Sequence, residues 1–289
     1  MRLRYDGTCE CGREVTAGSR AGWDRSNKMV VCTVCLDTQP SQPATELEPA
    51  PVAEAVPEAV LGPGLPGASL VREYESRKKR REDRVRAKHP KIGGFLLAIS
   101  DEPRTTKAFA TGAEGERRVA ARLEELAGGN TLFMHNRRRG ATARSGDIDH
   151  IAIASSGVFI IDAKNYANKA KNYANKKVRV RRTGGLFSPI REHLIVGGRD
   201  RSSLLDSIDK QAEAVRHALA DHVIGRGIEV TAVLCFVGAD LPMFGNLQVR
   251  GVSILGPRAA GKMLNRPGTL DDEQRREIWL HLAVKLPPA

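Results

Sequence analysis

"DIDHIAIASSGVFIIDAK", residues 147–164, decides the fold of the main domain. Two apolar, β-branched runs flank the turn residues Ser155, Ser156 and Gly157, and runs of this composition and length are typical of buried strands. The pattern therefore predicts a tight β-hairpin. Such a hairpin places Asp149, on the first strand, level with Asp162 on the second.

A charged pair interrupts the second apolar run at its carboxyl end. Side chains two residues apart in a strand share a face, so Asp162 and Lys164 point the same way. An ion pair at an exposed sheet edge is the simplest alternative, but such a pair contributes only about 0 to 1 kcal/mol. That is a weak reason to break a core strand, and we interpret the pair as part of a site.

A third carboxylate comes from the preceding helix, predicted over residues 112–129. Glu116 lies three residues before Val119 and seven before Leu123, so it shares their apolar stripe and faces the sheet. A buried helix acid is costly unless it is paired or bound to metal. Three converging carboxylates favour a hard divalent cation, Mg²⁺ or Mn²⁺. With the ammonium of Lys164 beside it, this set suits phosphodiester hydrolysis.

Neighbouring residues have alternative interpretations. Asp147 shares the face of Asp149 but lies further out, and it is a second choice as a ligand. His150 points to the opposite face, and a structural histidine is favoured over a catalytic base. Four arginines before the hairpin either contact the DNA backbone or belong to a solvated loop: Arg137, Arg138, Arg139 and Arg144.

The domain that carries the hairpin is predicted over residues 105–286. Its expected elements follow the order α-β-β-β-β-α-β-β-α, which indicates an α/β fold with a mixed central sheet flanked by helices. The strands after the hairpin are predicted at residues 177–182, 229–238 and 247–255. The later helices are predicted at residues 204–223 and 271–285.

The ordered motifs G-x-x-G-E (112–116), D-I-D-H and G-V-F-I-I-D-A-K-N-Y, followed by Gln211, resemble the nuclease-related domain family of the PD-(D/E)XK nuclease superfamily. The resemblance covers about residues 108–286. It implies a restriction-endonuclease-like fold and a metal-dependent nuclease acting on DNA. The implied site comprises Glu116, Asp149 and Asp162 as metal ligands, Lys164 beside the attacking water, and Gln211 as a supporting residue.

The heptapeptide AKNYANK occurs twice in succession, at residues 163–169 and 170–176. Only the first copy follows an apolar strand and has an aspartate two residues before its lysine, so Lys164 is the expected catalytic lysine. We interpret the second copy as a duplication that lengthens the loop beside the site. Longer loops cost little entropy, so the fold should persist. An impaired site would leave a nucleic-acid-binding or adaptor protein, which is the alternative function.

Four cysteines lie within residues 1–37, as Cys9-x-Cys11 and Cys32-x₂-Cys35. Two such knuckles twenty residues apart favour a structural Zn²⁺ site of zinc-ribbon type, with free thiols as the alternative. The first knuckle has one intervening residue where two are usual. So short a segment needs a metal to fold. The module can bind nucleic acid or a protein partner.

The composition separates two further regions. Residues 38–70 are rich in proline and alanine, and a disordered linker is expected there. Residues 71–104 begin with a strongly basic run that predicts an exposed helix, which either lies along phosphates or is simply solvated.

The net charge of the chain is +12, which favours a polyanionic partner or reflects an inert basic surface. No apolar run approaches the roughly 20 residues of a membrane span. The first residues lack a hydrophobic signal core, so a cytoplasmic protein without membrane contact is expected. The preference for DNA over RNA, the mode of cleavage and the oligomeric state are left open.

Overall fold

The computed structural model describes residues 3, 5–9, 11–24, 29–37, 61–140, 146–166, 177–185, 188–242 and 247–289. Most of the predicted linker, Arg144 and the second AKNYANK copy lie outside the described residues. The chain divides into two compact units, Met1–Ala55 and Val56–Ala289.

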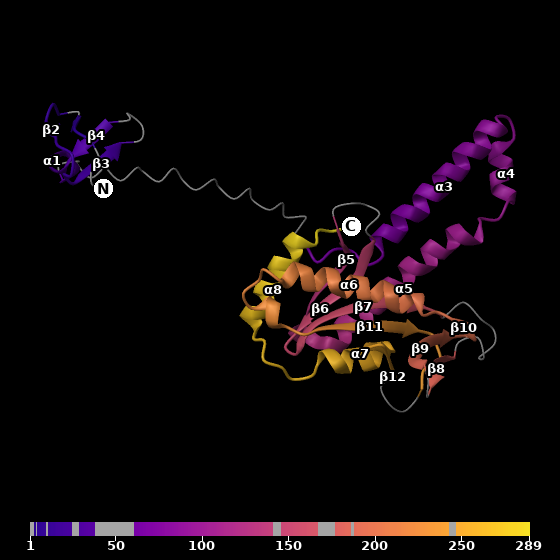
Figure 1. Ribbon diagram of the computed structural model, residues 1–289. Coiled ribbons are helices and arrows are strands. Elements are labelled where there is room, and N and C mark those ends of the chain that lie inside the picture. The colour runs from indigo at the N-terminus through magenta and orange to yellow at the C-terminus, as the bar shows by residue number, and fades with distance from the viewer. Residues whose placement is uncertain are drawn as a thin grey trace. The chain divides into compact units, whose positions relative to one another are not determined.

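The first unit consists of short strands and one short helix (Figure 1). Strands β1 (Gly7–Thr8) and β2 (Glu14–Val15) pair with each other, as do β3 (Ala21–Asp24) and β4 (Met29–Cys32), and α1 (Thr33–Asp37) follows. Among the residues described in this unit, the buried hydrophobic core contains five, two of them cysteines: Cys9, Val15, Ala21, Val30 and Cys32. A core this small cannot offset the chain entropy lost on folding, so a cross-linking metal is the expected source of stability.

The second unit is built on a six-stranded sheet with the order β12-β13-β11-β7-β6-β5. Its strands are β5 (Leu132–Arg138), β6 (Asp147–Ala154), β7 (Gly157–Asn165), β11 (Val230–Val237), β12 (Leu247–Val249) and β13 (Val252–Leu255). Strand β11 runs parallel to β7 and β13, and the other neighbours are antiparallel. The expected mixed central sheet is confirmed.

The hairpin of β6 and β7 has the register that the sequence predicts. Ala154 pairs with Gly157, so Ser155 and Ser156 form a two-residue turn, and the pairing continues to His150 and Ile161. Every residue from His150 to Ala154 is buried, because the hairpin lies in the middle of the sheet. Asp149 and Asp162 are the next residues beyond the last of these pairs.

Helices cover both faces of the sheet (Figure 1). The helices α5 (Arg104–Ala127) and α7 (Pro257–Leu264) pack on one face, where Leu123, Phe159 and Met263 share a core. The helices α6 (Ser203–Leu219) and α8 (Asp272–Lys285) pack on the other, around residues such as Ile160, Ile208 and Ile278. The apolar stripes predicted for α5 and α6 therefore form the two faces of the core.

A helical arm precedes α5. It consists of α3 (Ala68–Lys88) and the short α4 (Gly93–Ile99), and Figure 1 shows it projecting from the sheet. No residue of α3 is buried, in keeping with polar side chains all round this helix. Across the described residues, none of the helices has the length and apolar character that crossing a bilayer requires.

The structure differs from the expected element order in three places. The strand at 177–182 is β8 (Val178–Gly185), which joins β9 (Ser188–Val196) and β10 (Arg199–Asp200) in a separate sheet instead of extending the main one. Residues 247–255 form a hairpin, because the chain turns back at Arg250 and Gly251, both with positive φ. Helix α7 is additional; Pro257 at its start is well suited to a first helical position.

Candidate active site

Two glycines let helix α5 pack closely against its neighbours. A Cβ atom on Gly115 would lie 2.5 Å from Cβ of Asn165 on β7, and one on Gly112 would lie 2.8 Å from Cδ1 of Leu70 on α3. A larger residue at position 115 would push the helix away from the strand. The G-x-x-G-E motif is therefore a packing device that brings Glu116 to the carboxyl end of β7.

Asp162 and Lys164 point the same way from the end of β7. Asp162 is only 2% exposed, and the ammonium of Lys164 donates a hydrogen bond to its Oδ1. Asp149 accepts a hydrogen bond from the backbone N–H of Ala163 at Oδ2, with a nitrogen-oxygen distance of 2.9 Å. Asp149 therefore lies beside the stretch of β7 that contains Asp162, as the hairpin register predicts.

Glu116 completes the charged cluster from the opposite layer. Its side chain is buried on α5, and the backbone N–H of Gly67 hydrogen-bonds it. Burial, followed by the negative charge of Asp162, raises the pKa of Glu116 from 4.5 to about 7. Burial and the charges of Glu116 and Asp162 likewise raise the pKa of Asp149 well above its usual range. These carboxylates repel one another, so they favour a cation between them.

Lys164 is the cation that this cluster already contains. Burial acts to lower its pKa, but the negative charges of Asp162 and Asp149 outweigh that effect, and the net pKa is raised. The side chain is therefore an ammonium at neutral pH. It can donate hydrogen bonds and stabilise negative charge, but it has no free lone pair with which to act as a base.

A cavity of about 410 Å³ opens over the cluster. Glu116, Asp149 and Lys164 line it, and Arg201, before α6, lines it as well. The other lining residues come from α3, α5, β7 and α6: Leu70, Ala108, Thr111, Gly112, Ala163, Asn165, Tyr166 and Leu204. Asp162 is not among them; it is buried and bonded to Lys164, which does line the cavity. The cavity gives a ligand access to both carboxylates and the ammonium.

The sequence does not reveal three of the groups around this cavity. Arg201 lies in a polar turn with no motif around it, and Leu70 and Gly67 fall in the segment expected to be linker. The position of Asn165, directly after Lys164, could be predicted from the sequence. Period-two alternation places its side chain on the other face of β7, toward α5. Its Nδ2 donates to the carbonyl of Thr111 at 3.3 Å, which ties the strand to the helix.

Gln211 lies where its helical stripe predicts, buried on the face of α6 that packs on β7 and β11. It does not line the cavity. Asp147 lines a different hollow, beside Arg138, although its charge still contributes to the raised pKa of Glu116. His150 is fully buried and its Nδ1 lies 2.9 Å from Nδ1 of His135, so its environment is that of a structural histidine.

The arginines before the hairpin are less accessible than a DNA-binding loop requires. Arg137 is fully buried on β5, its guanidinium donates to the carbonyl of Gly62, and burial lowers its pKa to about 10. The predicted contact from Arg137 to DNA is therefore not possible in this structure, because the side chain is buried. Arg138 and Arg139 are half-buried, and Arg144 lies outside the described residues.

The carboxylate cluster has the donor chemistry of a divalent metal site. Asp162 Oδ2 and Gln211 Oε1 are buried oxygens without a hydrogen-bond partner in the described part of the chain. Such an oxygen is costly unless a ligand satisfies it. The three carboxylates are not grouped within 4.8 Å of one another, as the four cysteines are, among the residues described. Binding one cation through all three thus requires them to move closer.

The four cysteines of the first unit are assembled as a metal site would need. Sulfur atoms of Cys9, Cys11, Cys32 and Cys35 all lie within 4.8 Å of one another. Cys11 Sγ and Cys32 Sγ are 3.8 Å apart. A tetrahedral Zn²⁺ site with bonds of about 2.3 Å has sulfur-sulfur edges of about 3.8 Å. Hydrogen bonds from the backbone of Cys32 and Cys11 lower the pKa of Cys9 to about 6, which favours the thiolate.

Comparison with known proteins found a match to the part of the chain that contains this site. The family model described as nuclease-related domain matches residues 111–237. The matched segment runs from α5, five residues before Glu116, to the last residue of β11, and it includes Asp149, Asp162, Lys164 and Gln211. No curated protein and no solved structure was found to match. Residues 111–237 of this chain are therefore similar to the nuclease-related domain family.

Proposed function

We propose that this protein is a divalent-metal-dependent nuclease that hydrolyses phosphodiester bonds of DNA. The observation that carries the proposal is the convergence of Glu116, Asp149 and Lys164 on one cavity, with Asp162 directly beneath. A phosphodiester is a stable, anionic substrate, so its hydrolysis needs an activated water and compensation for negative charge. Carboxylates and an ammonium in one cavity are suited to both tasks.

The carboxylates would hold the metal, and Lys164 would act on the reacting groups. Mg²⁺ or Mn²⁺ bound to Glu116, Asp149 and Asp162 would lower the pKa of a water molecule and offset charge on the phosphate. Lys164 is protonated at neutral pH, so it would orient the attacking oxygen and stabilise the charge that develops on the phosphate. Gln211 would fix the buried carboxylates from the side of α6.

Protonation of the cluster sets its working pH. Because the pKa of Glu116 is about 7 and the pKa of Asp149 is also raised, a metal ion that binds them at lower pH must displace protons. Metal affinity, and with it cleavage, should therefore increase as the pH rises toward 8. This dependence is opposite to what an enzyme with a protonated carboxyl as general acid would give.

The remaining regions have supporting roles in this proposal. The cysteine cluster would hold a structural Zn²⁺, with four thiolates and no open position for catalysis. The first unit would engage nucleic acid or a protein partner. The exposed cations of α3 would add long-range attraction for a polyanion.

Plasmid nicking tests the proposal directly. Wild type should convert supercoiled DNA to nicked circles in Mg²⁺, and chelation of Mg²⁺ should stop the reaction. Asp162→Asn and Lys164→Ala should each cut at least about 100-fold more slowly, because the first removes a metal ligand and the second removes the ammonium that acts on the reacting phosphate.

Two further measurements separate the enzyme from an adaptor. Glu114→Gln, on the exposed side of α5, serves as the matched control and should cut like wild type. Binding of DNA by all four proteins without cutting by any would refute the nuclease and support the adaptor. Cutting that survives in Asp162→Asn would point to a contaminating enzyme or to a different site.

A further inference from the structure

The strands β8 and β9 form a ribbon with two unlike faces. Val178 and Val180 of β8, with their cross-strand partners Val196 and Leu194, pack into the main core. Because side chains alternate along a strand, the residues between them point outward. The ribbon is therefore anchored by one face and, apart from the buried Ile195, presents the other to solvent.

The outward face of the ribbon is strongly basic. Arg179 and Arg181 occupy successive outward positions on β8, Lys177 directly precedes this strand, and Arg191 on β9 lies opposite Thr183. All four cations are exposed. Successive outward side chains on a strand are about 6.6 Å apart. The result is a row of positive charge instead of a single point.

Little negative charge opposes this row within the described part of the chain. Asp200 is 3.7 Å from Arg181 and accepts a hydrogen bond from His193 Nδ1 at 2.9 Å. No ion pair joins Lys177, Arg179 or Arg191 to an acid there. Exposed arginines without partners are available to an external anion.

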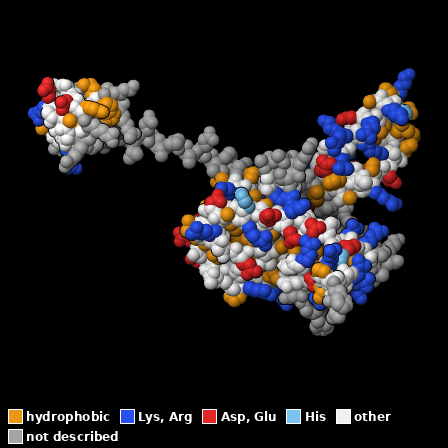
Figure 2. Space-filling view, viewed as in Figure 1, with side chains coloured by type: hydrophobic (Ala, Val, Ile, Leu, Met, Phe, Trp, Pro, Cys, Tyr) orange, Lys and Arg blue, Asp and Glu red, His pale blue; other side chains and the backbone are white. Residues whose placement is uncertain are grey.

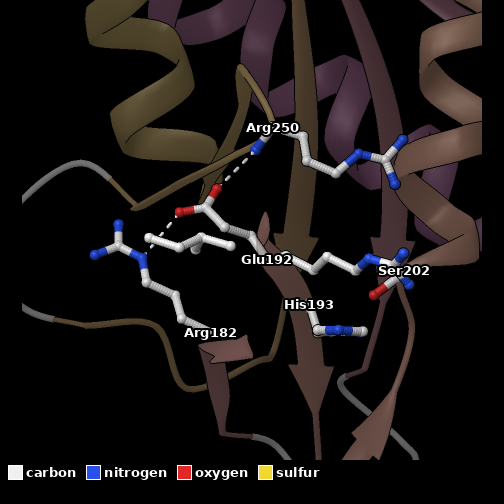
Figure 3. A pocket seen from close by; sticks show the side chains of 7 residues that line it. Arg182, Glu192, His193, Ser202 and Arg250 are labelled. Atoms are coloured by element: carbon white, nitrogen blue, oxygen red, sulfur yellow. Dashed lines mark hydrogen bonds and ion pairs between the residues drawn. The ribbon is translucent and has the colours of Figure 1, made fainter. Parts of the chain in front are cut away.

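In the hollow beside the ribbon, two of the three arginines are already paired with acids (Figure 3). This hollow of about 630 Å³ is lined by Arg182 and Arg250, and also by Arg191 of the outward row. Glu192 accepts from Nε of Arg182 at 3.0 Å and from the backbone N–H of Arg250 at 3.2 Å, as the dashed lines of Figure 3 show. The guanidinium of Arg250 bonds Asp206 and Asp209. Arg182 and Arg250 therefore attract an external anion less strongly than do the cations of the outward face that have no acidic partner in the described part of the chain.

The ribbon starts beside the candidate active site. Asn165, next to Lys164, pairs with Val237 at the end of β11, and Lys177 then bridges Asp240 just beyond that end. At the other side, Arg201 follows β10 and lines the active-site cavity. In Figure 2, Lys and Arg side chains lie where Figure 1 places β9 and β10. Positive charge therefore runs from the cavity onto the ribbon.

We propose that the outward face of the β8–β9 ribbon binds the phosphate backbone of a DNA duplex whose scissile bond lies in the active-site cavity. The proposal rests on the proposed function and says which surface holds the substrate. Lys177, Arg179, Arg181 and Arg191 contact phosphates, so they contribute affinity without sequence preference. This ribbon takes the role that the sequence suggested for the arginines around Arg137.

The salt dependence of DNA binding tests the proposal. The full-length Asp162→Asn protein, which does not cut, is titrated onto a short labelled duplex at several NaCl concentrations without divalent ions. The triple change Arg179→Ala, Arg181→Ala and Arg191→Ala in that background removes three phosphate contacts. The slope of log affinity against log salt should then become shallower by about 2 to 3, at roughly 0.9 per contact.

A charge-matched variant on α3 is the control. Lys78, Lys79 and Arg84 are also exposed cations, and replacing all three with alanine changes the net charge by the same amount. The slope should change by less than about 1 in this control. Equal effects of the two triple variants would mean that only net charge matters, and the ribbon would be ruled out.

Outcomes for the ribbon and for the nuclease are separable. If the ribbon variant keeps the salt-dependence slope of its parent, DNA binding by the ribbon is refuted. The nuclease proposal is still supported in that case if the wild-type protein cuts DNA. If wild type cuts no DNA but the slope falls as predicted, the ribbon is supported and the catalytic proposal fails. Circular dichroism of the ribbon variant should match that of its parent, because the replaced side chains are exposed.

Discussion

Replacing Glu116 with glutamine should stabilise the metal-free protein at high pH. The carboxylate lies buried beside Asp162, where its charged form is unfavourable. Glutamine has nearly the same shape and carries no charge at any pH. Glu116→Gln therefore removes a cost that the protein carries in order to bind a cation.

The pKa of Glu116 gives the size of this effect. Its pKa is about 7 in the folded protein, against an ordinary value of 4.5. The difference between these values corresponds to roughly 3 kcal/mol. The folded state binds the proton more tightly than the unfolded chain, so this stability is fully present below pH 4.5 and is lost as the pH rises through about 7.

Urea unfolding at pH 5 and pH 8, without divalent ions, measures the difference. The free energy of unfolding of Glu116→Gln should exceed that of wild type by up to about 3 kcal/mol at pH 8 and by much less at pH 5. Added Mg²⁺ should stabilise wild type and leave the variant nearly unchanged. As a control, Glu114→Gln on the same helix should show no gain at pH 8, because Arg117 already pairs with this glutamate. A Glu116→Gln protein that is equally or less stable than wild type at pH 8 would refute the reasoning.

Three further changes have expected outcomes. Arg137→Ala should lower the free energy of unfolding by about 3 kcal/mol, because it empties a buried position and leaves the carbonyl oxygen of Gly62 unpaired. The same change should leave DNA affinity unchanged. Weaker DNA binding by a fully stable variant would contradict a buried, structural role for Arg137. Gly64→Ala should expose the chain near residues 61–67 to limited proteolysis, because the new Cβ would lie 2.2 Å from His135 O and the backbone there has φ of +80°; an unchanged digestion pattern would count against that docking. Cys9→Ser should release Zn²⁺, measured with a colorimetric chelator, and should make residues 1–37 sensitive to protease; retention of stoichiometric zinc would exclude Cys9 as a ligand.

The parts of the fold that local sequence determines are the parts that could be predicted. The register of β6 and β7 follows from two apolar runs and a two-residue turn, so Asp149 and Asp162 could be placed together. Glu116 could be placed because a helical stripe of three residues defines its direction. The cysteine spacing predicts a cluster for a similar reason, since metal ligands impose short loops.

Features that depend on distant packing could not be predicted. Arg137 is inaccessible because residues 62 and 63 dock on β5, where His135 N–H bonds the carbonyl of Pro63 at 2.7 Å. Nothing near Arg137 in the sequence indicates that contact. The basic alternation of β8 is visible in the sequence, but its partner strand contains Pro189 and several charges, so neither the separate sheet nor its outward face was apparent.

Anomalous diffraction from crystals soaked in Mn²⁺ tests the central claim most directly. We expect a manganese peak at the carboxyl end of β7, within about 2.2 Å of oxygens from Asp149 and Asp162 and near Glu116, with Lys164 displaced from Asp162. The same crystals of Asp162→Asn should lack the peak. A wild-type crystal with full manganese occupancy elsewhere and none among these carboxylates would contradict the account.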